Sequence, residues 1–101
     1  MNNVKMNVVF SKTGDMKYLS HLDLLRLFQR ALRRAGLRAA LTQGFNPHMR
    51  ITIKRALKLG LESGGEDADF MLKESISPSD FIKRLNAKLP EGVKVLNAKI
   101  E

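Results

Sequence analysis

Apolar residues in this chain recur with two different periods, and the order of these periods constrains the fold more than any other feature. Four segments alternate apolar and polar side chains, as half-buried strands do: residues 4–10, 49–54, 68–72 and 93–100. Two segments repeat apolar side chains every three or four positions, as one-sided helices do: residues 20–35 and 77–89. The predicted order of elements is therefore β-α-β-β-α-β.

This order is that of the ferredoxin-like fold. The sequence therefore predicts an α+β domain with a four-stranded antiparallel sheet and two helices on one face. A chain of 101 residues with 44% hydrophobic content forms one modest core, and we expect residues 1–101 to be a single domain. The fold hosts many unrelated functions, so function has to be argued from particular residues.

The helix predicted over residues 20–35 has the clearest local signals. Ser20 and Asp23 form a capping box at its start, and Gly36 supplies a left-handed stop at its end. A second capping box, residues 77–80, has a proline at the first helical position and begins the other helix. Both helix starts are therefore specified locally.

Three segments are predicted to depart from regular structure. Residues 12–19 read as a turn and a short extended lead-in to the first helix. Residues 43–48 read as a loop, because Gly44 permits a positive φ and Asn46 precedes a proline. The alternation of the last strand slips near Leu96.

Several classes of site and location are disfavoured by what the sequence lacks. Cysteine is absent, which excludes a disulfide framework, a thiolate zinc site, an iron–sulfur cluster and a cysteine nucleophile within this chain. The first residues lack the apolar run of a signal peptide, and no apolar stretch is long enough to span a membrane. We expect a cytoplasmic protein with no cofactor and no membrane partner.

Charge is unevenly distributed along the chain, whose formal net charge is +8. Only Asp23 is acidic in a stretch with ten basic residues: Lys17, Arg26, Arg30, Arg33, Arg34, Arg38, Arg50, Lys54, Arg55 and Lys58. Only Lys73 is basic in the following stretch with six acidic residues: Glu62, Glu66, Asp67, Asp69, Glu74 and Asp80. We expect one electropositive and one electronegative region. The plainer alternative is a solvated surface whose two halves attract each other.

The exposed face of the first helix is the candidate binding surface. Its arginines stand about one turn apart and can bind phosphates bidentately: Arg26, Arg30, Arg33 and Arg34. Basic residues of the second strand extend this surface if that strand's exposed side lies nearby: Arg50, Lys54 and Arg55. The predicted third strand is acidic and lacks the stacked aromatics of an RNA-recognition motif, so RNA would contact the helix instead. An acidic protein surface is the alternative partner.

The loop and the histidines form a second candidate site. Five polar or aromatic residues make up the candidate recognition loop: His21, Gln43, Phe45, Asn46 and His48. Phe45 or Tyr18 could stack on a base, although plain turn chemistry also explains the loop. His21, Asp23 and His48 could bind a metal or cleave RNA, but His21 and Asp23 point in different directions around the helix start. We therefore predict structural hydrogen bonding, no metal site and no catalytic residue.

Three segments resemble one bacterial family: residues 17–36 (KYLSHLDLLRLFQRALRRAG), 43–48 (QGFNPH) and 59–63 (LGLES). The sequence is similar to the radical-SAM-linked proteins of unknown function, which are fused to, or encoded beside, a cobalamin-binding radical SAM protein. Family members often have proline where this chain has Met49. The resemblance leaves open that the chain is the N-terminal half of a longer protein.

The resemblance implies an accessory module whose partner is a radical SAM protein. The three-cysteine cluster motif of that chemistry must lie on the partner, because this chain has no cysteine. By analogy with radical SAM enzymes that modify tRNA, the module would hold RNA. The sequence thus predicts a non-catalytic accessory domain that binds RNA through its basic helix. The alternatives are a module that docks on an acidic surface of the radical SAM partner and, more distantly, a ribonuclease using His21 or His48.

Overall fold

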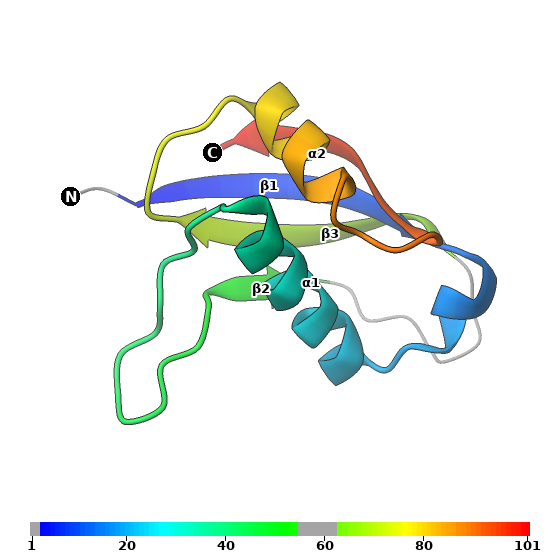
Figure 1. The fold of residues 1–101 in the computed structure, drawn as a ribbon, viewed down its shortest axis with the longest axis horizontal. Coiled ribbons are helices and arrows are strands. Elements are labelled where there is room, and N and C mark those ends of the chain that lie inside the picture. The colour runs from blue at the N-terminus through cyan, green and yellow to red at the C-terminus, as the bar shows by residue number, and fades with distance from the viewer. Residues whose placement is uncertain (1–2, 55–62) are drawn as a thin grey trace.

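The computed structural model describes residues 3–54 and 63–101 and contains one four-stranded sheet (Figure 1). Its elements are β1 (Val4–Lys12), the 3-10 helix η1 (Gly14–Tyr18), α1 (His21–Ala35), β2 (Ile51–Ile53), β3 (Ser63–Leu72), α2 (Pro78–Asn86) and β4 (Val93–Ile100). The strand order is β2-β3-β1-β4, and all neighbouring pairs are antiparallel. Both helices lie against the same face of this sheet (Figure 1). The predicted ferredoxin-like fold is confirmed.

Four phenylalanines join the sheet to both helices. The ring of Phe28 on α1 packs edge-to-face against Phe10 of β1 and Phe70 of β3, at centroid distances of 5.1 and 5.3 Å. Phe70 in turn contacts Phe81 of α2 at 5.5 Å. All four side chains are fully buried. Aromatic pairs in this geometry add to the stabilisation that burial gives, so this chain of rings is the centre of the core.

Both helices are capped as their sequences predict. The Ser20 hydroxyl accepts a 3.1 Å hydrogen bond from the backbone N–H of Asp23, and Gly36 ends α1 with a φ of 71°. The capping box of residues 77–80 begins α2 in the same way, with Ser77 accepting from the Asp80 N–H at 3.2 Å. These bonds satisfy backbone groups that the helix itself leaves without partners.

The sequence predicted an extended lead-in to α1 and an irregularity near Leu96 in the last strand, and the structure tests both. The lead-in to α1 is not extended, because Gly14–Tyr18 forms a turn of 3-10 helix in which Leu19 N–H bonds to Met16 O. Thr13 N–H also bonds to the carbonyl of Gly92, which holds this turn against the loop before β4. The slip predicted near Leu96 is confirmed as a β-bulge, since the register with β1 shifts between the partners of Phe10 and Val9.

Strand β2 is shorter than predicted because the chain before it belongs to a hairpin. Residues 38–50 leave α1, turn and return, with Leu41 bridged to Met49 and Arg50 N–H bonded to Ala40 O. This segment is called the 38–50 hairpin below. It projects from the edge of the sheet (Figure 1). The third strand begins at Ser63, earlier than the predicted 68, and α2 ends at Asn86 rather than at 89.

The sheet separates a covered face from an open face. The side chains of Ile51 and Ile53 belong to the partly or fully buried set packed around the core, so the alternate residues of this segment point to the open face. Arg50, Thr52 and Lys54 are exposed accordingly. In the described part of the chain, no helix is long and apolar enough to cross a membrane.

Candidate nucleic-acid interface

The outer face of α1 carries four exposed arginines: Arg26, Arg30, Arg33 and Arg34. The helix places them there because its opposite stripe, which includes Leu24, Phe28 and Leu32, is buried against the sheet. Positions four apart differ by about 6 Å along a helix axis. The predicted arginine face is therefore a continuous exposed ridge.

Acidic side chains compensate little of this charge. Among the described residues, Arg26 pairs with Asp23 at 3.9 Å, and both side chains are more than half exposed. Such a surface pair contributes about 0.5 kcal/mol or less and leaves the guanidinium available. Within residues 3–54 and 63–101, no acidic side chain pairs with Arg30, Arg33 or Arg34. The ridge is therefore electropositive.

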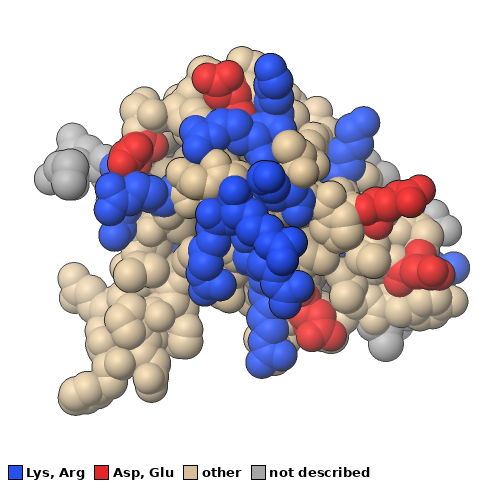
Figure 2. Space-filling model, in the orientation of Figure 1, with Lys and Arg blue, Asp and Glu red and all other residues tan. Residues whose placement is uncertain are grey.

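Helix α2 adds positive charge beside the ridge. Lys83, Arg84 and Lys88 are exposed on or just after this helix. Lys88 lines a hollow of about 370 Å³ together with Arg30 and Arg34, so cations of α1 and of the segment that follows α2 border one space. Figure 2 shows the basic side chains gathered over the two helices. We call six of these residues the basic helix surface: Arg26, Arg30, Arg33, Arg34, Lys83 and Lys88.

Apolar side chains line part of the hollow. Leu27 and Ala31 of α1 line it from one side, and Leu89 and Pro90 line it from the loop that follows α2. Lys83 and Lys88 were not among the cations predicted from the sequence, because the two helices are far apart along the chain. The predicted fold already indicated their contribution, because two helices on one face of a sheet lie side by side and expose their polar stripes together.

The basic residues around β2 do not extend this surface. Arg50 and Lys54 point to the open face, so the sheet lies between them and the outer side of α1. Arg55 lies outside the described residues. The described cations of the predicted set of seven therefore do not form one surface. The second strand was expected to extend the helix surface only if its exposed side lay nearby, and that side faces away from the helix.

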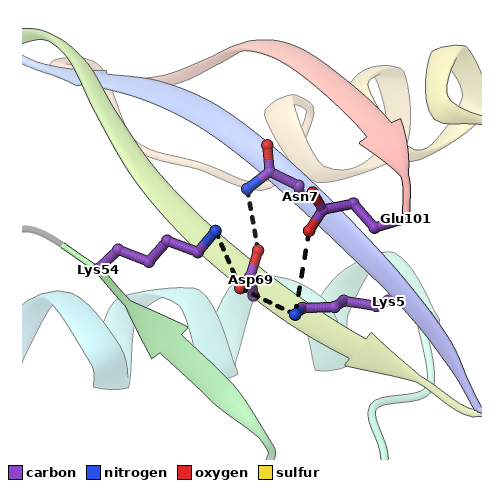
Figure 3. A network of polar contacts seen from close by, with 5 residues as sticks. All are labelled: Lys5, Asn7, Lys54, Asp69 and Glu101. Carbon is purple, nitrogen blue, oxygen red and sulfur yellow. Dashed lines mark hydrogen bonds and ion pairs between the residues drawn. The ribbon is translucent and has the colours of Figure 1, made fainter.

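The open face carries an ion-pair network centred on Asp69 (Figure 3). Its carboxylate accepts a 2.9 Å hydrogen bond from Asn7 Nδ2 and lies 3.3 Å from Lys54 Nζ and 3.6 Å from Lys5 Nζ. Burial by itself raises the pKa of Asp69, but the Asn7 hydrogen bond and the two ammonium groups outweigh it and lower the pKa below its ordinary value. Lys5 also lies 4.0 Å from Glu101.

This network corrects the prediction of an acidic, phosphate-repelling third strand. Glu66 points to the covered face and is 2% exposed, and Asp69 is paired with two lysines. Of the three acids predicted there, only Asp67 is exposed. Glu74 beyond the strand is paired with Arg38 at 3.3 Å. The alternation of β3 thus sends its described acids to different faces, and Glu66, Asp67 and Asp69 do not gather on one side of the strand.

The open face is nevertheless no platform for stacked bases. The aromatic rings that β1 and β3 carry, Phe10 and Phe70, are both buried on the covered face. Among the described residues, those on the open face around Asp69 are polar or aliphatic, such as Thr52 and Met71. The absence of an RNA-recognition-motif arrangement, predicted from the sequence, is confirmed for this part of the chain.

A comparison with protein-family models finds one whose description is an uncharacterized protein conserved in bacteria (DUF2344), and it matches residues 5–100. The chain belongs to the DUF2344 family. That description gives no activity and no partner. Neither the curated proteins nor the solved structures contain a match to this DUF2344 chain.

The candidate loop residues of this DUF2344 chain are brought together only in part. Gln43, Phe45, Asn46 and His48 all lie on the 38–50 hairpin and are exposed. His21 instead begins α1, where it is also exposed. Within the described part of the chain, no three His, Asp or Glu side chains gather as a metal ion requires. The structure therefore has two exposed candidate surfaces, the basic helix surface and the hairpin.

Proposed function

We propose that this domain is a non-catalytic accessory module that binds RNA through the basic helix surface. One observation carries the proposal: Arg30, Arg33 and Arg34 are exposed side by side without acidic partners among the described residues. Guanidinium groups bind phosphate oxygens bidentately and stay charged at any physiological pH. A ridge with arginines about one turn apart presents such groups to successive phosphates of a backbone.

The cations of α2 support a backbone contact rather than a single-phosphate site. Lys88, just after the second helix, lines the same hollow as Arg30 and Arg34, so a strand that follows α1 can also contact this lysine. Phosphate contacts of this kind position a nucleic acid without reading its sequence. The basic helix surface is therefore proposed as an anchoring surface for RNA.

We further propose that the module works beside a radical SAM protein. The similarity of residues 17–36 and 43–48 to the radical-SAM-linked proteins supports this association, and the chain itself has no cysteine for a cluster. In this arrangement the partner supplies the radical chemistry, and the DUF2344 domain holds the RNA that is modified. We expect no catalytic residue in the domain.

Docking on an acidic protein surface is the second candidate function. The hollow is lined both by Arg30, Arg34 and Lys88 and by apolar side chains, which a protein segment with acidic and aliphatic side chains would also fit. The natural partner of this kind is the radical SAM protein itself. This alternative uses the same residues as RNA binding, so the two have to be separated by experiment.

The test is fluorescence anisotropy of labelled tRNA across a salt series. If about five phosphates are contacted, the logarithm of the binding constant should fall with the logarithm of salt concentration at a slope of about −4. Arg30→Ala/Arg34→Ala should reduce that slope by about 2 and weaken binding at every salt concentration. The matched control is Lys94→Ala/Lys99→Ala, which removes two exposed charges from β4.

Three outcomes contradict the proposal, and a fourth selects the alternative. No anisotropy change at low salt would exclude RNA binding. Equal weakening by the two double variants would mean that net charge, not the basic helix surface, binds the RNA. RNA cleaved by the purified domain would contradict a non-catalytic role. Capture of the radical SAM protein that is abolished by Arg30→Ala/Arg34→Ala, with no RNA binding, would establish the docking alternative.

A further inference from the structure

Phe45 is the most exposed large hydrophobic residue of the described chain, with a relative exposure of 104%. The four other phenylalanines are fully buried in the core. The Phe45 ring therefore contributes nothing to the core and remains in water at the tip of the 38–50 hairpin. An aromatic ring held in this way is available to bind a partner.

The base of the hairpin is fixed to the sheet by backbone hydrogen bonds. Ala40 N–H bonds to Met71 O at 2.8 Å, and Met71 N–H bonds to Arg50 O at 3.0 Å. Lys73 N–H bonds to Arg38 O at 2.9 Å. Both arms of the hairpin are thus joined to the end of β3, and the hairpin is positioned before any partner arrives.

The stem and the tip are also ordered by local contacts. Thr42 N–H bonds to His48 O at 2.7 Å, and the Thr42 hydroxyl accepts a 3.0 Å hydrogen bond from His48 N–H. Gly44 has a φ of 120°, a conformation that L side chains rarely adopt. The turn thus projects Phe45 outward, and a preorganised loop loses less conformational entropy on binding.

The side chains around Phe45 have the chemistry that recognises nucleobases. Residues 41–49 contain no Lys, Arg, Asp or Glu. Gln43 and Asn46 supply amide donors and acceptors, and His48 supplies an imidazole. Unpaired bases are bound by stacking on an aromatic ring while amide groups hydrogen-bond to their edges. A tip that is uncharged, aromatic and rich in amides fits this occupant.

The hairpin also lies where a strand on the basic helix surface can reach it. It leaves the C-terminal end of α1, through Gly36 and Leu37. In Figure 2 the outer part of the hairpin protrudes at the lower left and shows no basic or acidic side chains, whereas the basic residues gather over the helices beside it. The cations that would contact the RNA backbone and the outer part of the hairpin are therefore visible on the same side of the molecule (Figure 2).

We propose that the tip of the 38–50 hairpin is a base-binding site, in which Phe45 stacks on one unpaired base of the RNA and Gln43 or Asn46 hydrogen-bonds to its edge. This inference rests on the proposed RNA-binding function and adds a specificity determinant to it. The helix surface anchors the backbone, whereas the tip selects single-stranded over duplex RNA and contacts one base.

The test uses the absence of tryptophan from the chain. Phe45→Trp places a unique fluorophore at the tip, and excitation at wavelengths selective for tryptophan reports on it alone. Titration with a single-stranded RNA should quench this fluorescence as a base stacks on the indole, and a duplex of the same sequence should quench it little. Anisotropy of the labelled RNAs measures overall binding separately.

The companion variant is Phe45→Ala. It should weaken binding of the single strand by about tenfold, within the range that base–aromatic stacking supplies, and leave duplex binding unchanged. Leu96→Ala is the control, because it removes another exposed large apolar side chain, in β4. Binding by this control should equal that of the unchanged chain. An unaltered thermal unfolding curve would show that Phe45→Ala folds normally.

The outcomes separate this inference from the proposed function. If RNA binds but Phe45→Ala binds it as tightly as before and the indole of the Phe45→Trp variant is not quenched, the base-binding site is refuted while RNA anchoring by the helices stands. If no RNA binds at all, both fail. If Phe45→Ala retains RNA binding and loses capture of the radical SAM protein, the ring inserts into a protein pocket and the inference is overturned.

Discussion

Arg84 of α2 donates a 2.7 Å hydrogen bond from Nη2 to the carbonyl oxygen of Ala35, the last residue of α1. The last carbonyls of a helix lack partners within the helix and form the negative end of its dipole. The guanidinium therefore both satisfies an unpaired acceptor and places a positive charge where the dipole favours it. This bond links the C-terminus of α1 to α2, the other basic helix.

Arg84→Ala should lower the free energy of unfolding by about 1 kcal/mol, because it removes a charge-assisted hydrogen bond at a solvent-exposed site. The matched control is Lys83→Ala, which removes the same charge from the neighbouring position. The control should change stability by less than about 0.5 kcal/mol. Urea denaturation of both variants measures the difference, and equal effects would mean that the Arg84–Ala35 bond contributes nothing.

Two glycines with positive φ should respond differently to alanine. A Cβ at Gly92, where φ is 97°, would lie 2.6 Å from Met16 Cγ and 2.7 Å from Thr13 O. A Cβ at Gly14, where φ is 61°, would meet no atom within 4 Å. We expect Gly14→Ala to cost about 1 kcal/mol from backbone strain alone and Gly92→Ala to cost about 2–3 kcal/mol. Similar unfolding midpoints for the two variants would contradict the close contact of η1 with the loop before β4.

The features that depend on neighbouring residues were predictable from the sequence. Ser20, Gly36 and residues 77–80 specify the helix ends through contacts within one turn, and the structure has the bonds that they imply. The order of the elements followed from the two apolar periods. The arginines of α1 are exposed as predicted, because the helical period fixes which face is buried.

The features that depend on residues distant in the sequence were not predictable in the same way. Asn7 and Asp69 are 62 positions apart and pair only once β1 and β3 have a register. The 38–50 hairpin is fixed by backbone bonds to Met71, for which no side-chain pattern gives a signal. The error over the acidic stretch was avoidable, since a strand period already sends Glu66 and Asp67 to opposite faces.

Substitution by alanine should destabilise the fold strongly at one phenylalanine and hardly at all at another. Phe28 is fully buried between two other rings, so Phe28→Ala should destabilise the fold by about 3–5 kcal/mol through lost burial and the cavity left behind. Phe45→Ala should change stability by less than about 0.5 kcal/mol, since its ring is fully exposed. Chemical denaturation checks both. A destabilised Phe45→Ala variant would mean that the ring packs against the domain and is not available to a partner.

Asp69 should make part of the stability depend on pH. Its pKa is lower in the folded state than in the unfolded chain, so the stabilisation it gives is present above the unfolded pKa of about 4 and is lost as pH falls through the folded pKa. Asp69→Asn should therefore cost about 1 kcal/mol at pH 7 and less at pH 3, because below about pH 4 the unfolded chain binds a proton at this carboxyl more readily than the folded chain does. Urea denaturation at the two pH values measures this difference, and carbon NMR of the carboxyl group measures the pKa directly. Asp67→Asn, at the exposed neighbouring position, is the control and should cost less than about 0.5 kcal/mol at pH 7. A difference between the unchanged chain and Asp69→Asn that is constant from pH 7 to pH 3 would contradict the stabilising role of the ion pairs with Lys5 and Lys54.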